Sequence, residues 1–225
     1  MFELYLDSAD LGAIHALSAS LPLAGVTTNP TILASSGQGL QQWLPALADI
    51  FRGQLRVHVQ VVAVTTEAMV AEALELAALP YDIVVKIPAH APGLAAIKKI
   101  KRQHDIPVLA TAIYNVQQGW LAALNGADYL APYLNRIDNL GQDGLGVVGD
   151  LQVLIDRYRL PTKLLVASFK NVQQVLQVLK LGVASVTLPP DIARAMLAAP
   201  ATDRAVEAFS LDWRGVHGER LSFQS

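Results

Sequence analysis

The residue with the clearest chemical potential in this sequence is a lysine inside an apolar run. Lys86 lies in the segment Asp82–Pro88, whose other residues are mostly β-branched, which is typical of a parallel strand covered on both faces. Burial lowers the pKa of a lysine, and the neutral amine is a nucleophile towards carbonyl groups. The structural alternative is a strand-end lysine that reaches a salt bridge or solvent, because buried lysines are rare unless they are paired or functional.

Other polar side chains lie within or directly after the predicted strands. They are Asp7, Thr28, Asn29, Gln60, Thr111, Tyr133, Asn135, Arg136 and Ser168. The carboxyl ends of strands in an eight-stranded α/β barrel form the face that carries active sites, so these side chains are expected to converge around Lys86. Each also has a structural explanation. Asp7 could cap a helix, Asn29 could form a turn before Pro30, and Arg136 could pair with Asp138. Ser168 could cap a helix, or hold a phosphate at a helix N-terminus.

The elements that position these residues alternate between strand and helix along the chain. Predicted strands cover residues 3–6, 24–28, 55–62, 82–88, 107–111, 128–131, 163–168 and 185–188. Helices are predicted between them, and residues 33–39 and 137–146 are predicted as loops. This alternation favours parallel βαβ units. We therefore predict an α/β fold, a single (β/α)8 TIM barrel domain over residues 1–225. An open doubly wound sheet is the competing fold, although no Gly-x-Gly-x-x-Gly turn follows the first strand.

A further amphipathic segment follows Pro200. Val206, Phe209, Trp213 and Val216 recur at three- or four-residue spacing, which indicates an extra C-terminal helix within residues 200–225. A closed barrel does not need this helix. It packs either on its own barrel or on a neighbouring subunit, and the apolar stripe favours the subunit interface.

Composition limits the classes of function. The chain has 225 residues, a net charge of -2 and no cysteine, and no apolar run is as long as a membrane span. We expect no nucleic-acid or membrane partner, no disulfide and no thiolate catalysis. The N-terminus does not resemble a signal peptide, so a cytoplasmic location is expected. The five histidines show no metal-ligand spacing and are interpreted as structural or exposed, so no metal or other cofactor is expected.

Five motifs together resemble the transaldolase family, and the resemblance covers essentially the whole chain. It is nearest to the short, bacterial fructose-6-phosphate aldolase branch. The motifs are Leu-Tyr-Leu-Asp7, Gly25-Val-Thr-Thr-Asn-Pro-Thr31, Ile83-Val-Val-Lys-Ile-Pro88, Ala131-Pro-Tyr-Leu-Asn-Arg-Ile-Asp138 and Ala167-Ser-Phe-Lys170.

This resemblance implies a catalytic group of four residues. Lys86 would form a Schiff base with a ketone donor. Tyr133 would be the acid/base, working through a water held with Gln60 and Thr111. Transaldolases carry a glutamate at the position of Gln60, whereas the aldolase branch carries glutamine. Glutamine cannot exchange a proton as a carboxylate can, so the proton transfer must pass to another group.

The resemblance also implies the groups that bind substrate. Asp7, Thr27 and Asn29 would bind the donor, and Arg136 and Ser168 would hold the acceptor phosphate. The expected partners are a ketone donor and a sugar phosphate, and the expected assembly is a homo-oligomer, a decamer by resemblance.

The predicted activity is that of a class I aldolase. It would reversibly cleave fructose 6-phosphate to dihydroxyacetone and glyceraldehyde 3-phosphate. The alternative is a transaldolase that passes the same three-carbon unit between sugar phosphates. A third hypothesis, from another class, is a non-catalytic barrel that binds phosphosugars.

Overall fold

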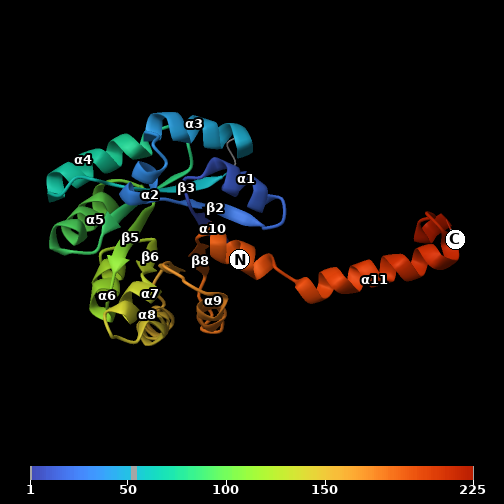
Figure 1. The fold of residues 1–225 in the computed structure, drawn as a ribbon. Helices are drawn as coiled ribbons and strands as arrows, with labels where there is room; N and C mark the ends of the chain where they lie inside the picture. The colour runs from blue at the N-terminus through green and yellow to red at the C-terminus, as the bar shows by residue number, and fades with distance from the viewer. Residues whose placement is uncertain (1, 52–54, 225) are drawn as a thin grey trace.

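The computed structural model describes residues 2–51 and 55–224, which form a closed barrel of eight parallel strands surrounded by helices (Figure 1). The strands are β1 (Glu3–Asp7), β2 (Leu23–Thr27), β3 (Arg56–Gln60), β4 (Ile83–Pro88), β5 (Val108–Ile113), β6 (Tyr129–Pro132), β7 (Lys163–Val166) and β8 (Ser185–Leu188). They pair in sequence order, and β1 pairs with β8 to close the barrel. The predicted (β/α)8 fold is confirmed, and the open doubly wound alternative is wrong.

Helices alternate with these strands and cover the outside of the barrel. They are α1 (Leu11–Ser18), α2 (Pro30–Ser35), α3 (Leu40–Phe51), α4 (Thr66–Ala77), α5 (Ala91–Gln103), α6 (Val116–Leu124), α7 (Leu134–Asn139), α8 (Gly144–Tyr158), α9 (Val172–Leu179) and α10 (Pro190–Leu197). The main hydrophobic core lies between the strands and these helices.

Side-chain alternation along β4 divides the core into two parts. Ile83, Val85 and Ile87 belong to the core beneath the helices, whereas Val84 belongs to a smaller cluster inside the barrel. Successive side chains of a strand point to opposite faces, so Lys86 shares the inward direction of Val84. The alternation therefore turns an apolar strand into a support for one inward lysine.

Two predicted loops contain helix. Residues 33–39 were expected to be a loop, but α2 covers Pro30–Ser35. Asn29 caps this helix, because its side-chain oxygen accepts a hydrogen bond from the backbone N–H of Ile32 at 3.0 Å. Pro30 follows at the first helical position, where its missing N–H has no cost. Residues 137–146 likewise contain the end of α7 and the start of α8.

The carboxyl ends of two strands adopt unusual backbone conformations. Ala112 in β5 has φ 55°, and the pairing register between β5 and β6 shifts between Ala110 and Ile113. Ser168, two residues beyond the end of β7, has φ 67°. Ser168 does not cap a helix, because Asn171 is the capping residue of α9. The prediction that Ser168 lies at a helix N-terminus is therefore wrong.

The predicted C-terminal helix is confirmed as α11 (Pro200–His217), followed by a short 3-10 helix η1 (Ser222–Gln224). Figure 1 shows α11 extending away from the barrel as an arm. None of the residues of α11 is buried, and Val206, Phe209 and Val216 are exposed. Across the described part of the chain, the helices are all too short or too polar to span a bilayer.

Candidate active site

Lys86 is buried inside the barrel near its carboxyl end. Only 5% of its surface is exposed, and its Nζ donates a hydrogen bond to the backbone carbonyl of Thr28 at 2.5 Å. The ion pairs found among residues 2–51 and 55–224 do not include Lys86. Burial lowers the pKa of Lys86, and the negative charge of Asp7 opposes this shift. The salt-bridge and solvent alternatives for Lys86 are therefore wrong, and its amine has the environment that a nucleophile needs.

Tyr133 lies directly after β6, and its phenol faces the end of β5. The hydroxyl groups of Tyr133 and Thr111 lie 2.9 Å apart and share a hydrogen bond. Burial raises the pKa of Tyr133, although the hydrogen bond with Thr111 works in the opposite direction. The phenol therefore stays protonated at neutral pH.

Gln60 ends β3 directly opposite Lys86 in the pairing register of β3 and β4. It is partly exposed, and its amide makes no hydrogen bond to any residue that the structure describes. The amide is therefore free to bind a water molecule or a substrate. The expectation of a hydrogen-bonding network around Gln60 is not met by protein groups.

A chain of hydroxyl groups holds Asp7 in place. Its Oδ1 accepts a hydrogen bond from the hydroxyl of Thr27 at 2.7 Å, and the hydroxyls of Thr27 and Thr187 lie 2.7 Å apart. Thr27 is completely buried behind the carboxylate. These contacts leave Asp7 Oδ2 available, so Asp7 can accept a hydrogen bond from a ligand hydroxyl.

Arg136 forms a cationic corner of the site. The guanidinium of Arg136 lies 4.8 Å from the centre of the Tyr133 ring, and its Nη1 donates a long hydrogen bond of 3.5 Å to Tyr114. The hydrogen bond with Tyr114 raises the pKa of Arg136, so its charge is permanent. Arg136 does not pair with Asp138, because the Asp138 carboxylate accepts hydrogen bonds from Gly144 and Gln174 instead.

A cavity of about 340 Å³ brings together six of the nine residues that have a predicted catalytic or substrate-binding role. They are Asp7, Asn29, Lys86, Tyr133, Arg136 and Ser168. Asn135 and Lys170 also line this cavity. The other three of the nine do not line it: Thr27 lies behind Asp7, Thr111 lies behind Tyr133, and Gln60 lies beside Lys86. Thr28, which was also predicted to converge on Lys86, contacts it through its backbone carbonyl. One cavity therefore contains a buried amine, a carboxylate and a guanidinium, which suits a ligand that has a carbonyl group, hydroxyl groups and an anionic group.

Sequence comparison identifies the family. The chain matches Transaldolase/Fructose-6-phosphate aldolase over residues 4–219. The chain belongs to this family. Membership supports an enzyme with Schiff-base activity of the aldolase or transaldolase type, and it does not separate these two reactions.

Solved structures show the same fold at low identity. A mutant flavocytochrome b2 superposes with a TM-score of 0.62 at 10% identity, over 86% of this chain and 57% of the flavocytochrome. A mutant mandelate oxidase superposes with a TM-score of 0.57 at 14% identity, over 97% of this chain and 74% of the oxidase. These likenesses concern the barrel alone.

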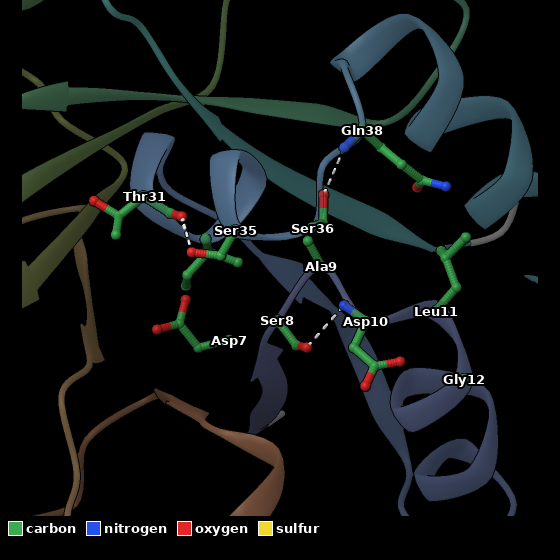
Figure 2. A pocket seen from close by; sticks show the side chains of 11 residues that line it. Asp7, Ser8, Ala9, Asp10, Leu11, Gly12, Thr31, Ser35, Ser36 and Gln38 are labelled. Atoms are coloured by element: carbon green, nitrogen blue, oxygen red, sulfur yellow. Dashed lines mark hydrogen bonds between the residues drawn. The ribbon is translucent and has the colours of Figure 1, made fainter.

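A second cavity adjoins the first on the Asp7 side. It has a volume of about 660 Å³ and shares Asp7, Thr31 and Ile32 with the first cavity. Figure 2 shows the carboxylate of Asp7 on the side of Thr31 and Ser35. The residues that line this second cavity include two carboxylates and several hydroxyl groups but no basic side chain. The second cavity is therefore acidic, whereas the first also contains the cationic side chains of Lys86, Arg136 and Lys170.

Sequence reasoning missed two residues that support the site. Thr187 lies in β8 and bonds to Thr27, and Tyr114 follows β5 and contacts Arg136. Their positions near strand ends were a usable signal for both. His58 was interpreted as structural or exposed, and it is fully buried inside the barrel.

Proposed function

We propose that this family member is a class I aldolase that reversibly cleaves fructose 6-phosphate into dihydroxyacetone and glyceraldehyde 3-phosphate. One observation carries the proposal. A buried lysine without an ion-pair partner shares a cavity with Arg136 and Ser168, which suit a phosphate. The third hypothesis, a non-catalytic barrel, needs the cationic corner but gives no reason to bury an amine at the cost of its desolvation.

In the cleavage direction, the reaction begins with attack of neutral Lys86 on the ketone carbon of the sugar. Loss of water gives an iminium, whose positive nitrogen withdraws electrons and takes the part that a metal ion plays in the other class of aldolase. The bond between C3 and C4 breaks, its electron pair forms an enamine, and the C4 hydroxyl loses its proton as the aldehyde forms. Protonation of the enamine at C3 and hydrolysis of the iminium then release dihydroxyacetone and regenerate Lys86.

We assign the proton transfers to Tyr133, working through a water held with Gln60 and Thr111. The raised pKa of Tyr133 keeps its proton on the phenol between steps. Asp7 and Asn29 would bind hydroxyl groups of the donor, with Thr27 orienting Asp7. Arg136 and Ser168 would hold the phosphate of the acceptor, because a guanidinium matches the geometry of a phosphate.

Transaldolase activity is the alternative within the same family. It would use the same Schiff base but pass the three-carbon unit to an aldose without releasing it. Gln60 favours the aldolase, since an amide cannot take the proton that a glutamate would take.

Trapping the intermediate tests the Schiff base. Borohydride is added to the protein in the presence of dihydroxyacetone, and the modified peptide is identified by mass spectrometry. The modification is expected on the peptide that contains Lys86 and is expected to be absent from Lys86→Met. A non-catalytic barrel would give no trapped product in either protein, and both would bind the sugar phosphate equally.

Product analysis separates the two reactions. Fructose 6-phosphate is supplied with and without an aldose acceptor, and glyceraldehyde 3-phosphate and free dihydroxyacetone are measured. Release of both products without an acceptor is expected for the aldolase. Turnover that requires the acceptor would identify a transaldolase. Gln60→Glu is the informative variant, and it should shift the protein towards transfer.

We also propose that the chain acts as one barrel domain within a homo-oligomer, a decamer by family resemblance, in which α11 packs on a neighbouring copy. The exposed apolar residues of α11 support this, since such a patch on an isolated arm would be unfavourable in water. Mass photometry of the full chain should show a large oligomer. Phe209→Ser should reduce its size, and a monomeric wild-type protein would contradict the proposal. The cytoplasmic location stays a prediction.

A further inference from the structure

A histidine in the centre of the barrel lacks partners. His58 lies in the middle of β3, is completely buried, and packs between the rings of Tyr5 and Tyr129 at 4.8 and 5.3 Å between centroids. Neither ring nitrogen has a hydrogen-bond partner among the described residues. A buried polar group without a partner is costly, whereas a phenyl ring would make the same edge-to-face contacts without this cost. Packing therefore does not explain why this position holds an imidazole.

Strand β3 places three polar side chains in one column inside the barrel. Val57 and Val59 belong to the outer core, so the alternate residues Arg56, His58 and Gln60 face inwards. Arg56, at the amino end of β3, donates hydrogen bonds to Asp82 and Tyr129. The side chains of His58 and Gln60, nearer the carboxyl end of β3, have no hydrogen-bond partner among the described residues. The unpartnered pair is therefore the part of the column that leads to Lys86.

The spacing of this pair fits one bridging water. Residues two positions apart on a strand are separated by about 6.5–7 Å. Two hydrogen bonds through one water molecule span about 5.6 Å between the outer polar atoms. The separation of the two backbone positions exceeds this span by only about 1 Å, which the flexible side chain of Gln60 can close by leaning towards His58.

We propose that His58 is a positioning residue, which binds an internal water that in turn holds the amide of Gln60 in the orientation needed for proton transfer at the donor carbon. The proposal rests on the proposed function, because it assigns Gln60 its role beside Tyr133. A neutral imidazole has one donor and one acceptor nitrogen and can order such a water in a single orientation. The burial of His58 and the positive charge of Arg56 both lower the pKa of His58 and favour this neutral form.

Exchange of donor hydrogen tests the proposal at the relevant step. Dihydroxyacetone is incubated with the enzyme in D2O without acceptor, and loss of its C–H signal is followed by NMR. We expect His58→Phe to exchange about tenfold more slowly than wild type, the loss of roughly one ordered hydrogen bond. His58→Asn retains a polar group and should restore part of the rate. Leu165→Val, a matched change to the apolar interior of the barrel, should lower thermal stability and leave the exchange rate unchanged.

Borohydride trapping at Lys86 in each protein distinguishes a failure of the proposed function from a failure of the role proposed for His58. If wild type gives no trapped adduct, the proposed function fails and this inference fails with it. If wild type is trapped and His58→Phe exchanges at the wild-type rate, only the role of His58 is overturned. A high-resolution crystal structure of wild type provides a test that needs no variant. A water within hydrogen-bond distance of His58 and Gln60 is expected, and its absence would overturn the proposal.

Discussion

The two ends of the barrel use polar side chains in opposite ways. At the amino end of the strands, Glu3 accepts hydrogen bonds from Tyr5, Tyr129 and Lys163, and Tyr129 also accepts one from Arg56. Every member of this network has a partner of matching charge or hydrogen-bonding type. Such a network holds the barrel closed and has no group left over for a ligand.

At the carboxyl end, the polar groups are only partly satisfied by the protein. Lys86 is held by one backbone carbonyl, Gln60 by no described residue, and Arg136 by one long hydrogen bond. These free donors and acceptors lower stability, and they are the groups that a substrate can bind. The comparison teaches that satisfied polar groups mark the structural end of the barrel and incompletely satisfied ones mark the reactive end.

Of the substitutions that test this comparison, Tyr133→Phe should have the largest effect on activity. The change removes the proposed acid/base and one hydrogen bond to Thr111, so kcat is expected to fall about 10²–10³-fold. Stability should change by no more than about 1 kcal/mol, because a single partly buried hydroxyl is lost. Steady-state kinetics and thermal melts measure both quantities. A large loss of stability with little loss of kcat would show that Tyr133 stabilises the barrel and does not take part in the reaction.

The reciprocal change at the amino end is Glu3→Gln. It keeps the shape of the side chain but removes the charge that Lys163 pairs with, so we expect a loss of about 1–2 kcal/mol in the free energy of unfolding, reduced by partial exposure. The kcat of the folded enzyme should not change. Urea unfolding combined with an activity assay tests this, and Lys180→Gln, on the outer helices, provides the control for charge removal.

The same residue predicts an acid dependence. Burial raises the pKa of Glu3, but hydrogen bonds from Lys163, Tyr5 and Tyr129 outweigh burial and leave the pKa lowered. The stabilisation is therefore present above the ordinary pKa of 4.5 and is lost as pH falls through the folded-state value. Glu3→Gln should be less sensitive than wild type to pH in this range.

Between the two ends, His58 predicts a weaker acid effect at higher pH. Burial and the positive charge of Arg56 lower its pKa well below 6.5, so the folded protein keeps it neutral while the unfolded chain takes up a proton. Its contribution is therefore complete above about pH 6.5 and declines as pH falls, by at most about 1.4 kcal/mol per pH unit. In urea titrations from pH 7 to 5, wild type should lose more stability than His58→Phe. Parallel curves would show that His58 is not held neutral.

The features that sequence could predict are those set by local patterns. The apolar strand around Lys86 and the strand-end positions of Asp7, Tyr133 and Arg136 follow from alternation and from the strand–helix rhythm. Since parallel strands share one polarity, strand-end residues had to meet at one end of the barrel. The closed barrel was predictable from the number of strand–helix units, since eight such units are typical of a TIM barrel.

The remaining features depend on tertiary contacts that no local pattern encodes. The helix α2 was missed because Asn29-Pro30 is equally typical of a turn, and its capping role shows only once the chain has folded. Arg136 was assigned a nearby carboxylate as one alternative, but Tyr133 and Tyr114 surround it instead. His58 could not be distinguished from other histidines, because its burial depends on Tyr5 and Tyr129, which lie far away in sequence.

The smallest expected effect concerns backbone strain, which is also concentrated at the carboxyl end. Among the described non-glycine residues with positive φ, Ala112 lies near the end of β5 and Ser168 lies just after β7, whereas Arg159 is the C-terminal cap of α8. Ala112→Gly relieves the strain of the left-handed conformation but adds freedom to the unfolded chain, so we expect a net gain of about 0.5 kcal/mol.

Ala110→Gly, in the same strand with an ordinary backbone, provides the matched control for Ala112→Gly. It should lose about 1 kcal/mol, since it removes a buried methyl group and gains no relief of strain. Ala112→Gly should also retain kcat, because the hydrogen bond between Thr111 and Tyr133 does not involve the side chain of Ala112. Equal losses of stability in the two variants would show that Ala112 stores no strain, and the contrast between the two ends of the barrel would then rest on side chains alone.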